Sequence, residues 1–84
     1  MDRRELLQRL ETNKHNVSFT VFVDLLEGFG FRLLRIRGGH HMFRKPGLRE
    51  LVNIQPRKGE AKPYQIQQFL GLVERYNLKL EEDQ

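Results

Sequence analysis

Residues 31–45, FRLLRIRGGHHMFRK, decide how this chain folds. The first seven residues have the composition of a β-strand, and Gly38-Gly39 follows them as a two-residue turn. The favoured turn of a two-residue hairpin needs positive φ at both central positions, which glycine adopts without steric cost. Residues 40–45 then read as a second strand. The segment therefore predicts an antiparallel β-hairpin.

A third strand and three helices are expected around this hairpin. Residues 50–55 follow a Pro46-Gly47 turn and would complete a three-stranded antiparallel meander. Apolar side chains recur at helical spacing over 2–11, 19–27 and 63–76, so each of these segments predicts a helix. The resulting order, α-α-β-β-β-α, predicts an α+β fold in which the helices pack on one face of the sheet and the other face stays open.

Length and composition exclude several classes of protein. A chain of 84 residues and 10.1 kDa is the size of one small domain. It contains no cysteine, which excludes disulfides and thiolate metal sites. No apolar run is long enough to span a membrane, and the charged N-terminus does not read as a secretory signal. We expect a soluble, cytoplasmic protein without a membrane partner.

The charge is concentrated in the middle of the chain. Residues 32–62 contain nine Lys and Arg but only two Glu, whereas residues 1–31 and 63–84 are each net negative. A solvated surface is the simplest interpretation of such a block, but this asymmetry is more typical of a surface that binds a polyanion. Nucleic-acid phosphate is the usual polyanion, and the pattern alone does not distinguish RNA from DNA.

The adjacent histidines His40 and His41 should point to opposite faces of the sheet, because side chains alternate along a strand. This arrangement makes them a poor pair of metal ligands. His41 shares a face with Phe43, a core candidate, whereas His40 shares one with Arg44, which prefers solvent. We therefore expect His40 on the open, basic face. A register slip of one residue would put His41 there instead, so His41 is the alternate candidate.

A histidine beside cations is suited to RNA cleavage. RNA carries its own nucleophile, the 2′-hydroxyl, and imidazole exchanges protons near neutral pH. One positioned acid or base contributes about 10²–10⁴-fold to the rate, and fixed cations stabilise the charge that develops on phosphate. No metal ion or cofactor is required. The alternatives are a histidine that only contacts phosphate and one that is packed in the core.

The motifs resemble those of the HicA family of toxin–antitoxin ribonucleases. The residues that carry the resemblance are LLEGFGF at 25–31 and RGGHHMFRKPG at 37–47, followed by the third strand, a basic loop and a closing helix. The resemblance covers about residues 19–78. It implies a fold like that of a double-stranded-RNA-binding domain and a type II toxin that cleaves mRNA and so blocks translation. It also implies His40 as the catalytic residue and a HicB antitoxin as partner.

The chain departs from the family pattern in three places. Gly38-Gly39 stands where Gly-Ser is commoner, which should matter little to the backbone. Residues 55–59 lack the histidine often found there, so a second acid or base at that place is in doubt. Residues 1–17 form an N-terminal helical extension of the single HicA-like domain expected over 1–84, and residues 81–84 are expected to fray.

The candidate RNA-binding residues come from the turn, the second strand and the basic loop. They are Arg37, Gly38, Gly39, Arg44 and Lys45, with Arg57 and Lys58 at the rim. We expect an mRNA substrate and no binding to DNA by the chain itself.

Three other functions use the same features. A non-catalytic RNA-binding module would use the same basic face and leave RNA intact. A DNA-binding protein would place the sheet in the major groove, but few polar side chains are available to read bases. An adaptor for acidic proteins ranks last, because the sequence shows no evident exposed apolar patch.

Overall fold

The computed structural model describes residues 2–83, and its elements follow the predicted order. They are α1 (Arg3–Thr12), α2 (Phe19–Gly28), β1 (Arg32–Arg37), β2 (His40–Arg44), β3 (Val52–Ile54), α3 (Pro63–Arg75) and the short 3₁₀ helix η1 (Glu81–Asp83). The α+β class and the open three-stranded antiparallel sheet are confirmed. The third strand is shorter than the expected 50–55.

The sheet has β2 in its centre and β1 and β3 at its edges. In the β1–β2 hairpin Ile36 pairs with His41 and Arg37 with His40, and the register shifts by a bulge between Leu33 and Arg35. Gly38 and Gly39, the turn between these strands, have φ of 58° and 82°. Both values are positive, as the two-residue hairpin turn requires.

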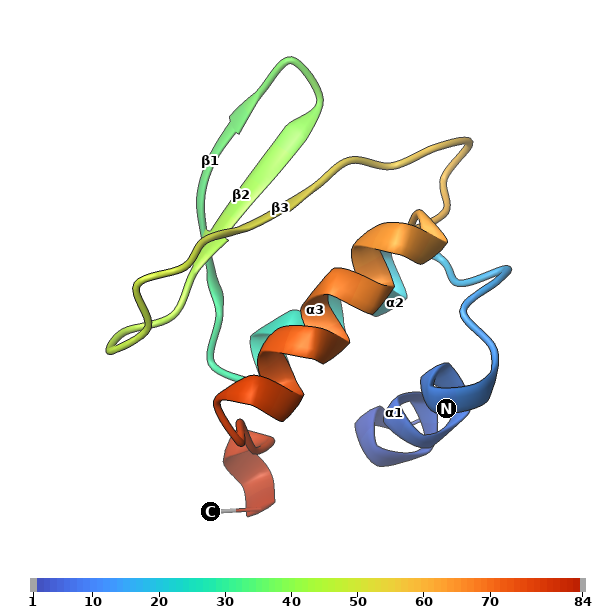
Figure 1. The fold of residues 1–84 in the computed structure, drawn as a ribbon. Coiled ribbons are helices and arrows are strands. Elements are labelled where there is room, and N and C mark those ends of the chain that lie inside the picture. Colours follow the sequence, from blue (N-terminus) through green and yellow to red (C-terminus); the bar gives the residue numbers. More distant parts are fainter. Residues whose placement is uncertain (1, 84) are drawn as a thin grey trace.

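The core lies between the helices and one face of β2 and β3. The ring of Phe69 on α3 packs edge-on against Phe22, Phe29 and Phe31, with centroids 5.4 to 5.7 Å apart. The sheet contributes buried side chains such as Phe43. β1 contributes none, because all six of its residues are exposed. Figure 1 shows that, of the three strands, β1 lies farthest from α3.

The first helix packs on α2 through the core. Asp2 caps its N-terminus by accepting a hydrogen bond from the backbone N–H of Glu5 at 2.8 Å, and this bond lowers the pKa of the Asp2 carboxyl. Leu6 and Leu10 are buried in the same apolar cluster as the side chains of α2. Gly28 on α2 leaves no space for a Cβ, which would lie 2.6 Å from the side chain of Arg3.

Residues 81–83, part of the C-terminal tail that is expected to fray, form the 3₁₀ helix η1. Leu80 is 2% exposed and anchors the segment in the core. The carboxylates of Glu81 and Glu82 then lie 3.7 Å from the guanidinium groups of Arg32 and Arg3, respectively. Gln84, which was included in that expectation, lies outside the described residues. Over residues 2–83, no helix is long and apolar enough to cross a membrane.

The packing of α1 predicts that Leu10→Ala destabilises the protein. Leu10 is 0% exposed, and truncating a fully buried leucine typically costs about 2–5 kcal/mol. Urea denaturation followed by circular dichroism measures the loss. The exposed Gln8→Ala on the same helix is the control and should stay within about 0.5 kcal/mol of wild type. Equal stabilities for the two variants would contradict the packing described for α1.

Candidate nucleic-acid interface

The two central histidines occupy different environments. His40 is exposed and shares the open face of the sheet with Arg44, while His41 is half-buried on the helix side with Phe43. The ring of His41 meets that of Phe19 edge-on with centroids 4.9 Å apart, and its Nδ1 lies 3.0 Å from the Gly39 carbonyl oxygen, to which it donates. The alternation along β2 thus separates the two imidazoles, and His41 is held by packing.

A shallow apolar groove adjoins His41 on the helix side of the sheet. It is lined mainly by Phe19, Val23, Leu33, Ile36 and Phe43. Glu27 is the charged residue of its lining, and none of the residues that line it is Lys or Arg. The groove beside His41 is thus lined without Lys or Arg, whereas Arg37 pairs with His40 on the other face.

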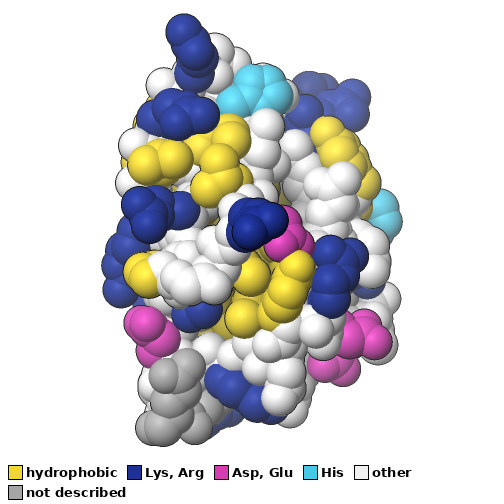
Figure 2. All heavy atoms as spheres, turned by 60° about the vertical axis from the view of Figure 1, so that its left-hand side comes forward, with side chains coloured by type: hydrophobic (Ala, Val, Ile, Leu, Met, Phe, Trp, Pro, Cys, Tyr) yellow, Lys and Arg dark blue, Asp and Glu magenta, His cyan; other side chains and the backbone are white. Residues whose placement is uncertain are grey.

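Arginines accompany His40 on the open face. Arg37 pairs directly with His40 across the hairpin, and Arg35 and Arg32 pair with Met42 and Arg44. All of these arginines are exposed. Arg32 also donates to backbone carbonyls at the end of α2. Figure 2 turns this side of the molecule forward and shows Lys and Arg side chains in several groups with hydrophobic side chains between them.

Three of these guanidinium groups are available to an external anion. Among residues 2–83, no carboxylate lies within ion-pair distance of Arg35, Arg37 or Arg44. The predicted residues Arg37 and Arg44 thus share the open face of the sheet with His40. Arg35 and Arg32 were not among the predicted site residues, although strand alternation combined with the hairpin register could have identified them.

The remaining predicted cations lie outside the strand positions that carry this row. Lys45 is half-buried, and its Nζ donates to the Phe29 carbonyl oxygen at 2.7 Å, so it satisfies the end of α2. Arg57 and Lys58 are exposed in the turn after β3, where Arg57 and Glu60 exchange two backbone hydrogen bonds. Lys58 takes a positive φ of 51° in this turn.

Three polar side chains near the hairpin turn were not among the predicted site residues: Asn53, Gln55 and Lys62. Asn53 lies in β3, and its Oδ1 is 3.2 Å from His40 Nδ1. The amide nitrogen of Gln55 is 3.3 Å from the position a Cβ on Gly39 would take, and its Oε1 accepts a hydrogen bond from Lys62 Nζ at 3.1 Å. The alternation Val52-Asn53-Ile54, buried–exposed–buried, is the signal that places Asn53 on the open face.

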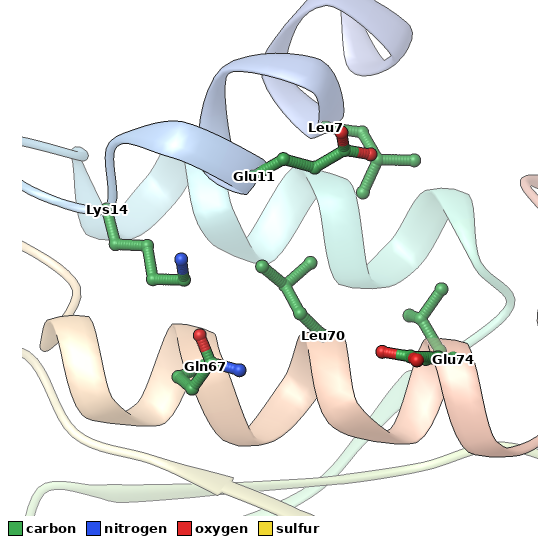
Figure 3. Close-up of a pocket in the computed structure, with 7 residues that line it drawn as sticks. Leu7, Glu11, Lys14, Gln67, Leu70 and Glu74 are labelled. Carbon is green, nitrogen blue, oxygen red and sulfur yellow. The ribbon is translucent and has the colours of Figure 1, made fainter.

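The site is an open surface rather than a pocket. A larger hollow lies elsewhere, between α1 and α3, where Leu7 and Leu70 face each other with Glu11, Lys14, Gln67 and Glu74 around them (Figure 3). It lies on the side of α3 away from the sheet and contains no histidine. Within the described part of the chain, no three His, Asp or Glu side chains gather as a metal site would require. An exposed imidazole in a row of guanidinium groups is suited to an extended polyanion.

An exposed apolar patch that is not evident from the sequence borders this surface. Leu33, Leu34 and Ile36 on β1 are 43 to 56% exposed, and Leu33 and Ile36 line the apolar groove together with Val23 of α2. The reason is that β1 extends past the helices, so its helix-side residues meet solvent. Clusters of this kind mark protein contact surfaces more often than isolated exposed leucines do.

The geometry of the hairpin turn predicts that substituting its two glycines affects stability to different extents. Gly38 has open space around it and a φ that asparagine tolerates, so Gly38→Asn should keep stability within about 0.5 kcal/mol. At Gly39 a side chain would press on Gln55 at a φ of 82°, so Gly39→Val should cost on the order of 1–3 kcal/mol. Thermal or urea unfolding of both variants measures this. Equal losses at the two positions would contradict the turn geometry.

One protein family matches the segment that carries the sheet. The model of the family described as HicA toxin of bacterial toxin–antitoxin matches residues 21–73, more than half of the chain. The match begins within α2 and ends within α3, so it includes the whole sheet and the Gly-Gly-His-His motif. The comparisons with curated proteins and with solved structures gave no match. The chain belongs to the family of HicA toxins of bacterial toxin–antitoxin systems.

Proposed function

We propose that this toxin is an endoribonuclease that cleaves mRNA with His40 as general acid or base and without a metal ion. One observation carries the proposal: the imidazole of His40 is exposed on the open face of the sheet, paired with Arg37 and on the same face as Arg35 and Arg44, and these arginines have no carboxylate partner within residues 2–83. An imidazole and several free cations on one surface supply the two elements that scission of a phosphodiester needs.

The reaction uses the nucleophile that RNA provides. His40 Nε2 takes the proton of a 2′-hydroxyl, and the 2′-oxygen attacks the adjacent phosphorus. The bond from phosphorus to the 5′-oxygen breaks, and that oxygen takes a proton from the solvent, to which His40 Nε2 releases the proton it accepted. The products are a 2′,3′-cyclic phosphate and a 5′-hydroxyl. Arg37, directly across the hairpin from His40, is placed to stabilise the added negative charge on the phosphate in the transition state.

The partner of this toxin is proposed to be a HicB-type antitoxin acting in the cytoplasm. The toxin offers such a protein unpaired arginines on the open face and, on the helix side of β1, an apolar patch at the edge of the same sheet. Charge of opposite sign on the antitoxin would speed its association, and the apolar side chains would add buried area. An antitoxin seated there would cover His40.

The alternative is a non-catalytic RNA-binding module that uses the same face. Its affinity for RNA would fall steeply with salt, because each neutralised phosphate releases counterions. The placement of the arginines is equally suited to this function, so the two proposals differ only in whether the bound RNA is cut.

Substitution of His40 distinguishes the two. Purified protein, free of antitoxin, is incubated with RNA in excess EDTA, and the products are separated on a denaturing gel. We expect wild type to cleave and His40→Ala to be slower by at least about 10²-fold, because the variant lacks the proton acceptor. Circular dichroism should show an unchanged fold, since His40 is exposed.

His15→Ala is the matched control, because His15 lies in an exposed turn outside the site. It should cleave at the wild-type rate. Cleavage by His40→Ala at the wild-type rate, or cleavage that requires an added metal ion, would contradict the proposed mechanism. Intact RNA with salt-dependent binding by the wild-type protein would support the RNA-binding module instead.

A further inference from the structure

The ring nitrogen of His40 that faces β3 has a defined partner. Nδ1 lies 3.2 Å from Oδ1 of Asn53, the side-chain carbonyl oxygen of that residue. With the amide in this orientation its carbonyl oxygen accepts the hydrogen bond, so Nδ1 donates and carries the hydrogen. A neutral imidazole carries one hydrogen on its two nitrogens. Nε2 of the neutral ring is therefore left with a lone pair.

The sheet holds Asn53 in this position. Its flanking residues Val52 and Ile54 are 6% and 1% exposed and fix β3 against the core. Asn53 pairs with Met42, which places His40 two residues along β2, on the same face. Diagonal neighbours on one face of an antiparallel pair are within reach of long side chains. The amide is thus presented to the imidazole by buried neighbours, although both partners are exposed.

The side chains placed around the ring are cationic or neutral. Arg37 lies across the hairpin on β1, Arg44 lies on the same face of β2, and Lys62 is held by Gln55 beside the turn. Among the residues described, no carboxylate lies within 4.0 Å of a nitrogen of His40. The amide of Asn53 orients the ring without adding a negative charge that would stabilise the imidazolium.

We infer that Asn53 is a positioning residue, whose side-chain carbonyl holds His40 in the Nδ1–H tautomer and leaves Nε2 as the proton acceptor toward the arginine-bearing face. The effect of Asn53 on cleavage rests on the proposed ribonuclease function. The tautomer of His40 can be tested whether or not the protein cleaves RNA. The orientation of a histidine by the bond at its other nitrogen is a general feature of sites in which one imidazole nitrogen does the chemistry.

The tautomer is measured directly by long-range ¹H–¹⁵N correlation NMR on the protein without RNA, at a pH where His40 is neutral. In wild type, Nδ1 should give the shift of a protonated nitrogen and Nε2 that of an unprotonated one. Asn53→Ala and Asn53→Val should lose this pattern and give the mixture of a free imidazole. Gln68→Ala, which truncates an exposed amide on α3, should keep the wild-type pattern.

Cleavage kinetics give a second readout. Asn53→Ala should lower kcat on the order of 10- to 100-fold with KM nearly unchanged, the range seen when the group that orients a histidine is removed. Asn53→Asp keeps an acceptor at the same place and should restore the tautomer. Its negative charge stabilises the imidazolium, so the acidic limb of the pH–rate profile should move to higher pH.

An Nε2–H tautomer in wild type, or an unchanged tautomer in both Asn53→Ala and Asn53→Val, would overturn the inference. A wild-type protein with the Nδ1–H tautomer that leaves RNA intact would overturn the ribonuclease proposal but support the role of Asn53. A cleaving wild type whose kcat is unaffected by either truncation would overturn the positioning role and leave the ribonuclease proposal standing.

Discussion

The register of the central strand is the constraint on which the site depends, and burial of Phe43 fixes it. Phe43 is 1% exposed, and burying a phenylalanine side chain is worth about 1.5–3 kcal/mol. A slip of one residue would expose Phe43 and turn Arg44 into the apolar layer, which costs several kcal/mol for an unpaired charge. The same alternation puts His41 inside and His40 outside. The exposure of His40 therefore follows from packing on the opposite face.

This constraint divides the sheet into surfaces with different properties. The open face carries exposed arginines and no buried side chain, so a polyanion can contact it without any rearrangement of the fold. The helix-side face is closed over β2 and β3 but open over β1, where apolar side chains reach solvent. A small toxin thus presents, side by side, a surface suited to RNA and a surface suited to a protein that would block it.

Features that follow from local periodicity could be predicted from the sequence. The hairpin, the helices and the outward direction of His40 depend on alternation and glycine turns. Features that depend on contacts distant in sequence could not. Lys45 continues the basic run of β2, but its Nζ reaches the Phe29 carbonyl at 2.7 Å. The hydrogen bond between His40 and Asn53 depends on the β2–β3 register, which the sequence does not specify. The apolar patch on β1 depends on how far the helices extend over the sheet.

The most direct test of the account uses an RNA oligonucleotide that the protein cuts at one mapped site. In a matched oligonucleotide, the nucleotide whose 2′-hydroxyl adjoins the scissile phosphate is replaced by its 2′-deoxy form. If His40 activates that hydroxyl, the unmodified RNA is cut in EDTA to a 2′,3′-cyclic phosphate and a 5′-hydroxyl, and the deoxy substrate stays intact. Cleavage of the deoxy substrate at the same bond would contradict the account, because the nucleophile would then have to be something other than the ribose hydroxyl.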